Sequence, residues 1–188
     1  MNKTYKMTIA GCERALPICK ASDTLSIGAF VIFGDVELTV AAAAALLKIA
    51  PEYDYMVAPE AKAIPLIHEM ARQSGRNTYF LVRKAPKLYM DGVFAVEDQS
   101  ITTKGKQMLY MDGADARKIA GKRILILDDV ISTGGSIAAV ESLVKQAGGQ
   151  VVGRMAILAE GKAALRDDIL FLKPLPLFDK AGNPLPIE

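Results

Sequence analysis

Cysteine and histidine, the residues on which disulfide and zinc scaffolds depend, are scarce in this sequence. Its 188 residues include two cysteines, Cys12 and Cys19, and a single histidine. The two cysteines are too far apart for a C-x-x-C pair, so neither a disulfide framework nor a zinc site is indicated. We therefore expect a protein that works in a reducing, cytoplasmic setting.

A large excess of charge of one sign and long apolar runs are also lacking. The formal net charge is +2, which is too small to indicate a polyanionic partner such as nucleic acid. The longest apolar segment, AAAAALLKIA at residues 41–50, is too short to cross a bilayer, and the N-terminus has no apolar signal core. We expect no nucleic-acid partner, no membrane association and no targeting segment.

What is present is the composition of a globular domain. Apolar residues make up 51% of the chain and charged residues 23%, a balance typical of one sizeable core. Strands that are hydrophobic on both faces and alternate with helices are typical of a parallel sheet covered on two sides. The prediction is an α/β fold with an open, doubly wound, mostly parallel sheet. Its expected strands are 53–58, 78–83, 123–128 and 150–159, and its expected helices are 36–49, 61–73 and 134–146.

This single domain, residues 1–188, divides into parts of different character. Residues 1–34 are expected to form a small β-rich region, and residues 35–160 the core. Within the core, residues 84–121 interrupt the alternation with lysines, glycines and threonines, and a long insertion of this kind is usually functional. Residues 161–188 contain several prolines and are expected to be an irregular C-terminal extension.

The stretch RILILDDVISTGGS, residues 123–136, ends an apolar strand in two adjacent carboxylates, Asp128 and Asp129. We expect both at the solvent-exposed end of the strand, where their charges are tolerated. The small residues that lead into the next helix are Ser132, Thr133, Gly134, Gly135 and Ser136. In such a strand-to-helix loop, unpaired backbone N–H groups, the helix dipole and hydroxyl donors together hold an anion. The second half of the stretch therefore predicts a phosphate-binding loop.

Two other nucleotide-binding loops are excluded at this position. A P-loop requires a lysine directly after its second glycine, and the G-x-G-x-x-G pattern is absent as well. Helix capping explains one carboxylate but not two. A ribose ring explains the pair, because carboxylates accept hydrogen bonds from vicinal hydroxyls while the 5-phosphate of the same sugar occupies the loop. The stretch as a whole predicts a site for a sugar phosphate.

The apolar strand, the acidic pair and STGGS together resemble the phosphoribosyl pyrophosphate (PRPP) motif of the type I phosphoribosyltransferases, most closely the adenine-type members. The resemblance implies catalytic roles at the ribose for Asp128 and Asp129, and it implies that residues 132–136 hold the 5-phosphate. It also implies that residues 1–34 form a hood over the base and that a flexible flap closes the site.

Two further segments resemble the parts of these enzymes that hold the leaving pyrophosphate. Residues 57–71, VAPEAKAIPLIHEMA, resemble a loop written G-x-E-A-R-G-F, and residues 81–92, LVRKAPKLYMDG, resemble V-R-K-x-x-K-L-P. The resemblance assigns pyrophosphate binding to Glu60, Ala61, Lys62, Arg83, Lys84 and Lys87. From the residues alone, a solvated lysine in the first helical turn and an ordinary solvated basic patch remain alternatives.

The flap separates this chain from the adenine enzymes. Those enzymes carry a Glu-Tyr pair there, whereas the aligned segment DQSITTKGKQ offers Ser100, Thr102, Thr103 and Lys104. A flap of this type is closer to the one found in xanthine-type and regulatory relatives. The base therefore stays open between adenine and another purine such as xanthine, hypoxanthine or guanine.

The resemblance implies Mg²⁺-dependent transfer, in which a purine nitrogen attacks the anomeric carbon of PRPP, pyrophosphate leaves and a nucleoside monophosphate forms. Adenine, giving AMP in purine salvage, is the favoured base. Mg²⁺ is expected to be carried by PRPP without a ligand cage from the protein, and a homodimer is expected with the basic loop near the subunit contact. The alternatives are an enzyme for a pyrimidine or other base, and a non-catalytic PRPP-binding regulator. Such regulators carry a DNA-binding helical region ahead of this domain. In this chain residues 1–34 are β-prone instead, which counts against the regulator.

Overall fold

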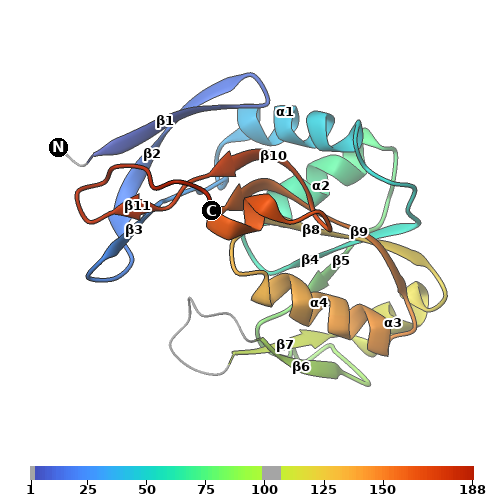
Figure 1. Ribbon diagram of the computed structural model, residues 1–188. Coiled ribbons are helices and arrows are strands. Elements are labelled where there is room, and N and C mark those ends of the chain that lie inside the picture. The colour runs from blue at the N-terminus through green and yellow to red at the C-terminus, as the bar shows by residue number, and fades with distance from the viewer. Residues whose placement is uncertain (1–2, 99–106) are drawn as a thin grey trace.

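A five-stranded parallel sheet forms the centre of the computed structural model, which describes residues 3–98 and 107–188 (Figure 1). The strands lie in the order β10-β9-β8-β4-β5, and every neighbouring pair is parallel. Their bounds are Tyr55–Pro59 (β4), Phe80–Val82 (β5), Arg123–Ile131 (β8), Gln150–Glu160 (β9) and Leu170–Leu175 (β10). The predicted α/β class and the parallel sheet are confirmed.

Helices cover both faces of this sheet, because successive residues of a buried strand point to opposite sides. The helices are α1 (Val36–Leu47), α2 (Ile64–Gln73), α3 (Gly113–Ile119) and α4 (Gly135–Gln146). Leu125 and Leu127 of β8 pack in one core with α1 and α2, while Ile124 and Ile126 pack in a second core with α3 and α4. Figure 1 shows the two helix layers on opposite sides of the strands, as a doubly wound fold requires.

The sheet changes its winding direction between β4 and β8, which are hydrogen-bonded neighbours. From β4 the chain proceeds outward to β5 on one side, whereas from β8 it proceeds through β9 to β10 on the other. Open α/β sheets bind ligands at such a switch point, beyond the carboxyl ends of the strands. The fold therefore brings together the loops that follow Pro59 and Ile131.

A second, antiparallel sheet has the strand order β1-β2-β3-β11. Its strands are β1 (Thr4–Ile9), β2 (Cys12–Lys20), β3 (Leu25–Gly28) and β11 (Phe178–Asp179). The expectation of an irregular C-terminal extension is wrong, since β10 forms an edge of the parallel sheet and β11 completes the antiparallel one. The prolines of this segment suggested a break, but an edge strand such as β10 accommodates Pro174 without losing a central ladder bond.

Other boundaries also depart from those expected from the sequence. Strand β8 continues to Ile131, beyond the two carboxylates, and the insertion contains α3 and a hairpin of β6 (Phe94–Asp98) and β7 (Gln107–Met111). The predicted flap residues Ser100, Thr102, Thr103 and Lys104 lie outside the described residues. Among the residues that the structure does describe, no helix has the length and apolar character needed to cross a membrane.

Candidate functional site at the carboxyl ends of β4 and β8

The two carboxylates of β8 are less exposed than the sequence suggested. Asp129 is only 2% exposed, so the expectation that both groups sit at the solvent-exposed end of the strand is wrong. The strand continues for two residues beyond Asp129, so this carboxylate does not lie at the end of the strand, while Asp128 is half-buried. Asp128 Oδ1 accepts a hydrogen bond of 2.8 Å from the backbone N–H of Asp129. Burial, and then the charge of Asp129, raise the pKa of Asp128 well above its ordinary value.

Lys62 supplies a positive charge to this acidic pair. Its Nζ lies 3.0 Å from Oδ2 of Asp129, although the approach is not aligned for a hydrogen bond, so the contact is an ion pair. Lys62 follows β4 and Asp129 belongs to β8, so the pair connects the two loops of the switch point. The sequence predicted both residues as parts of one site, and the structure brings them into contact.

Glu160, at the end of β9, is a neighbour of this pair that the sequence did not single out. Burial raises the pKa of Glu160, and the positive charge of Lys62 opposes that shift. Lys62 therefore faces an acidic group on β9 as well as one on β8. The signal in the sequence is weak, because a single glutamate at the end of an apolar strand is common.

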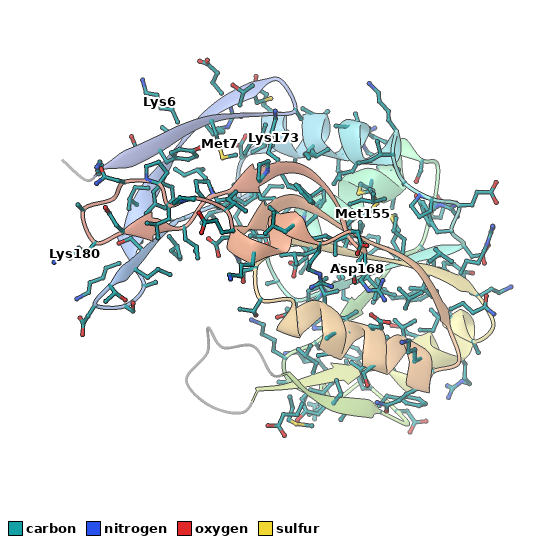
Figure 2. All side chains as sticks on the ribbon, in the orientation of Figure 1. Lys6, Met7, Met155, Asp168, Lys173 and Lys180 are labelled. Atoms are coloured by element: carbon teal, nitrogen blue, oxygen red, sulfur yellow. The ribbon has the colours of Figure 1, made fainter. Side chains whose placement is uncertain are left out.

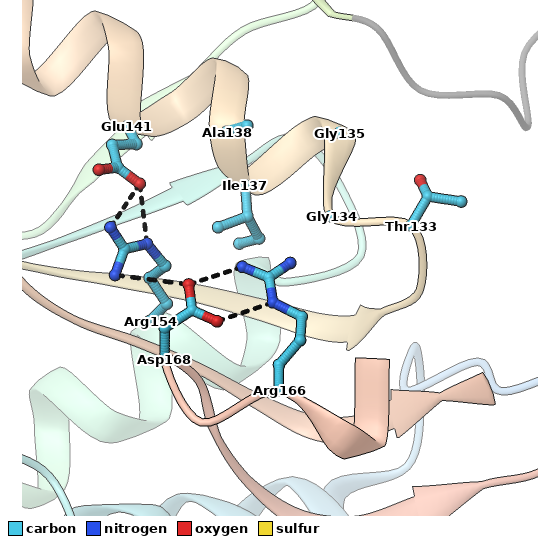
Figure 3. Close-up of a pocket in the computed structure, with 9 residues that line it drawn as sticks. All are labelled: Thr133, Gly134, Gly135, Ile137, Ala138, Glu141, Arg154, Arg166 and Asp168. Atoms are coloured by element: carbon cyan, nitrogen blue, oxygen red, sulfur yellow. Dashed lines mark hydrogen bonds and ion pairs between the residues drawn. The ribbon is translucent and has the colours of Figure 1, made fainter. Parts of the chain in front are cut away.

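The loop of small residues after β8 leads directly into α4, as predicted. Gly134 is the N-cap of this helix and has a φ of +83°, in the left-handed region that favours glycine. It has no side chain with which to cap the helix, so the positive end of α4 remains available to an anion. Thr133, Gly134 and Gly135 line a pocket of about 370 Å³ beside the start of α4 (Figure 3).

Arg166 on the far side of this pocket is a second residue that the sequence did not single out. A Cβ atom added at Gly134 would collide with Nη1 of Arg166. Nε and Nη2 of the same guanidinium donate hydrogen bonds of 2.8 and 2.7 Å to the two carboxylate oxygens of Asp168. The pocket is completed by Arg154, which pairs with Glu141 of α4 at 2.6 Å. Sequence reasoning missed Arg166 and Asp168 because it treated the segment after Glu160 as an extension, and it placed Arg154 within a strand without assigning it a role.

The loops after β4 and β5 are joined through Glu60. Its Oε2 accepts hydrogen bonds of 3.1 Å both from Nε of Arg83 and from the backbone N–H of Lys84. Burial raises the pKa of Glu60, but the Lys84 N–H and Arg83 outweigh it, so the pKa lies below its ordinary value. Glu60 thus holds the basic loop in place, while Lys84 is exposed and Lys87 is half-buried. The peptide bond between Glu60 and Ala61 is cis.

Sequence comparison places this geometry in a family. The model of the phosphoribosyl transferase domain matches residues 35–181, which is most of the chain. The chain belongs to this phosphoribosyltransferase family. The acidic pair and the glycine loop lie in the matched part of the chain, and the predicted similarity to type I phosphoribosyltransferases is confirmed.

Individual relatives include enzymes named for different purines. An adenine phosphoribosyltransferase of Thermotoga petrophila is 37% identical over 109 residues, which is 58% of this chain and 60% of the relative. A hypoxanthine/guanine phosphoribosyltransferase of Methanococcus maripaludis is 32% identical over 110 residues, 58% of this chain and 55% of the relative. The chain thus spans 55–60% of the length of these two curated relatives.

Among solved structures, the adenine phosphoribosyltransferase of Thermoanaerobacter pseudethanolicus superposes with a TM-score of 0.63. The two sequences are 26% identical, and the match covers 76% of this chain and 84% of that one. An adenine phosphoribosyltransferase of Leishmania donovani has the same TM-score of 0.63 at 17% identity, covering 92% of this chain and 76% of that one, which supports the fold alone.

Proposed function

We propose that this protein is a purine phosphoribosyltransferase that transfers the phosphoribosyl group of PRPP to adenine, forming AMP and releasing pyrophosphate. The observation that carries the proposal is the contact between Lys62 and Asp129, 3.0 Å apart, across the switch point of the sheet. It unites an acidic pair suited to a ribose, a glycine loop suited to a phosphate and a cation suited to the leaving group. Each of these three parts serves one portion of PRPP.

The acidic pair and the glycine loop bind the phosphoribosyl portion. Asp128 and Asp129 accept hydrogen bonds from the ribose hydroxyls, and their negative charge stabilises the positive charge that grows on the ring as the bond to pyrophosphate breaks. The 5-phosphate is held by the backbone N–H groups and hydroxyls at the start of α4. The residues with this role are Ser132, Thr133, Gly134, Gly135 and Ser136.

The basic residues of the two neighbouring loops bind the pyrophosphate. Lys62, Arg83, Lys84 and Lys87 supply the cations, and the backbone at Glu60 and Ala61 completes the loop. Because Lys62 already pairs with Asp129, the pyrophosphate competes with that carboxylate for the same ammonium group. Binding of PRPP would then leave Asp129 available to the ribose hydroxyls.

Mg²⁺ is part of this proposal, and the residues present fit its use with PRPP. The acidic pair offers hard oxygen donors, the type that Mg²⁺ prefers. Within residues 3–98 and 107–188, no three His, Cys, Asp or Glu side chains are grouped closely enough to hold a metal ion by themselves. The ion is therefore proposed to arrive with PRPP, whose oxygens provide most of its ligands. When bound, it neutralises charge on the leaving pyrophosphate.

The base is proposed to bind beneath the antiparallel sheet, with residues 1–34 acting as its hood within a single domain of residues 1–188. Arg14 of β2 supports this arrangement, because its Nε lies 2.6 Å from Oδ2 of Asp35, the N-cap of α1 in the core. The flap role stays with Ser100, Thr102, Thr103 and Lys104 as a proposal. Residues 161–188 then contribute to both sheets rather than forming a separate unit.

Hypoxanthine or guanine is the second candidate for the base. The 32% identity to the Methanococcus maripaludis hypoxanthine/guanine enzyme favours it. The absence of a Glu-Tyr pair from the flap segment favours a base other than adenine without selecting one. Adenine is placed first because relatives named for adenine reach 37% identity. Xanthine, and a PRPP-binding regulator without catalysis, remain the other outcomes that an assay separates.

A homodimer in a reducing, cytoplasmic setting belongs to the same proposal. Leu88 is fully exposed and Tyr89 is 68% exposed, and both follow directly on the basic loop. Neighbouring apolar side chains on a surface commonly mark a contact with another protein. The two free cysteines, Cys12 and Cys19, fit the reducing setting.

The decisive experiment is a steady-state assay with Mg²⁺, PRPP and each of adenine, hypoxanthine, guanine and xanthine. We expect turnover with adenine and release of pyrophosphate. Turnover with another purine alone would replace adenine in the proposal, and calorimetric binding of PRPP without any turnover would identify a regulator. As internal controls, Asp128→Asn and Asp129→Asn are each expected to lower kcat by orders of magnitude while circular dichroism stays unchanged.

A further inference from the structure

We infer that Arg166 is a direct ligand of the 5-phosphate of the sugar, and that Asp168 holds it in position for that role. The inference rests on the proposed function and deepens it, because it assigns a cation to a site that the glycine-loop motif describes only by its backbone and hydroxyls. Arg166 comes from the segment after β9, which is remote in sequence from the glycine loop.

The guanidinium of Arg166 is oriented by two parallel hydrogen bonds. Nε and Nη2 donate to Oδ1 and Oδ2 of Asp168 at 2.8 and 2.7 Å, an arrangement that fixes the plane of the group. The third nitrogen, Nη1, points away from Asp168 and toward Gly134 (Figure 3). Across the described part of the chain, Nη1 makes no hydrogen bond, so its two N–H groups are available to a ligand.

Gly134 and Arg166 depend on each other sterically. The guanidinium nitrogen occupies the space in which the Cβ of any other residue at position 134 would lie. The glycine therefore serves two purposes: it permits the left-handed turn at φ +83°, and it allows a cation to approach the phosphate loop from the side. An anion bound to the N–H groups at the start of α4 would lie within reach of Nη1.

The electrostatics of α4 also indicate an anion at this place. The N-terminal end of a helix carries partial positive charge, so a cation beside it is unfavourable unless an anion is shared between them. Arg166 nevertheless lies beside Gly134, the N-cap of α4. Asp168 offsets part of the charge, but it contacts the opposite edge of the guanidinium. A phosphate dianion at the loop would interact favourably with both the helix and Nη1.

Asp168 is itself held in place by a charged neighbour. Nη1 of Arg154 lies 3.9 Å from Oδ2 of Asp168, and Nη2 of Arg154 lies 2.6 Å from Oε2 of Glu141. Figure 2 shows Asp168 between the sheet and α4, in agreement with the residues that line the pocket. The contacts of Asp168 with Arg154 and with Arg166 thus favour the orientation of Arg166 toward the loop. Asp168 is a positioning residue.

The test measures binding of ribose 5-phosphate, PRPP and pyrophosphate by calorimetry in the presence of Mg²⁺. We expect Arg166→Ala to lower the affinity for ribose 5-phosphate and for PRPP by about tenfold to a hundredfold, the usual effect of losing a charged hydrogen bond. Pyrophosphate affinity is expected to stay unchanged, because that group binds at the loops after β4 and β5. Arg166→Lys should give a smaller loss of affinity, because it keeps the charge although it loses the two parallel hydrogen bonds to Asp168. Asp168→Asn should also lower the affinity for both sugar phosphates.

Lys162→Ala is the matched control, because Lys162 is an exposed cation in the same segment. It should leave all three affinities unchanged. The inference is overturned if Arg166→Ala binds ribose 5-phosphate within twofold of the wild type, or if it weakens pyrophosphate equally, which would indicate a structural effect. If Arg166→Ala does not fold, the comparison of Arg166→Lys with the wild type decides the question by the same criteria. Failure of the wild type to bind both PRPP and ribose 5-phosphate would instead refute the proposed function.

Discussion

At the scale of single residues, Asp128 and Asp129 combine a cost in stability with a proposed role in binding. Asp129 is buried beside the half-buried Asp128, and Nζ of Lys62 lies 3.0 Å from Oδ2 of Asp129. The pKa of Asp128 is raised by burial and by its neighbour, which means that the folded state favours its protonated form. The acidic pair, which is proposed to stabilise positive charge on the ribose, is therefore expected to lower the stability of the fold.

The first prediction is that Asp128→Asn increases the stability of the folded protein at neutral pH while abolishing turnover. A carboxyl group whose pKa is raised on folding contributes most to stability when the pH is below its pKa in the unfolded state. That contribution is lost as the pH rises toward its pKa in the folded state. Asparagine does not titrate, and its Oδ1 can still accept the N–H of Asp129. The gain from the substitution should therefore grow as the pH rises above 3.8. Urea unfolding at several pH values measures it.

Asp54→Asn is the control with the opposite sign. Hydrogen bonds from the side chain and then the backbone N–H of Arg123 lower the pKa of Asp54. The contribution of Asp54 to stability is therefore present at a pH above the ordinary pKa of the carboxyl group and is lost as the pH falls. Asp54→Asn should destabilise the protein at neutral pH and have a smaller effect in acid. If both variants respond to pH in the same direction, the assigned environment of Asp128 is incorrect.

The second prediction concerns Gly134→Ala. Alanine in a left-handed conformation costs about 1 kcal/mol, and here its Cβ would also displace Arg166. Gly75→Ala is the matched control, since Gly75 has a φ of +68° and open space around it. Both variants should be less stable than the wild type in denaturant titrations, but only Gly134→Ala should weaken the binding of ribose 5-phosphate. Equal phosphate binding by the two variants would show that the space at position 134 is not needed.

At the scale of elements, the C-terminal strands connect the two sheets. Strand β10 pairs with β9 in the parallel sheet, and β11 pairs with β3 in the antiparallel one. Phe178 of β11 is fully buried and packs edge-on against Tyr5, with ring centroids 5.1 Å apart. The segment after Glu160 thus adds buried apolar area to the N-terminal sheet, which has few core residues of its own.

The third prediction is that Phe178→Ala destabilises the protein by about 3–5 kcal/mol, the usual cost of removing a buried aromatic ring. The comparison is Phe33→Ala, because Phe33 is 50% exposed and its loss should cost less than about 1 kcal/mol. Chemical denaturation of the two variants measures the difference. Similar costs for both would mean that β11 is not part of the antiparallel sheet in solution.

At the scale of the whole molecule, the exposed apolar residues beside the basic loop bear on assembly. Fourth, Leu88→Glu should convert the proposed homodimer to a monomer in sedimentation velocity, because a buried charge at a contact is unfavourable. Circular dichroism should not change, since Leu88 is fully exposed in the chain. Ile49→Glu, at a position 44% exposed, is the control and should leave the assembly intact. A wild-type monomer at micromolar concentration would refute the proposed dimer.

The order of the strands and helices from α1 to β9, outside the insertion at residues 84–121, was predictable because it depends on local patterns. The apolar runs ending at Asp128 and Glu160 formed strands, and the capped run after Asp35 formed α1, with Asp35 accepting the N–H of Leu38. The C-terminal strands were not predictable in this way. Their prolines indicated irregular chain, and only pairing with β9 and β3 makes them strands. Tertiary contacts decide such weak segments.

The sequence by itself determined the class of site, because a glycine loop after a strand and an acidic pair are encoded within one continuous stretch of β8 and α4. Only the tertiary structure decided that Asp129 is buried, that Lys62 meets it, and that Arg166 reaches the loop from the segment after β9. The physical reason is that backbone geometry and helix dipoles follow from neighbours in the chain. Burial and charge pairing follow from residues that the fold brings together from distant parts of it.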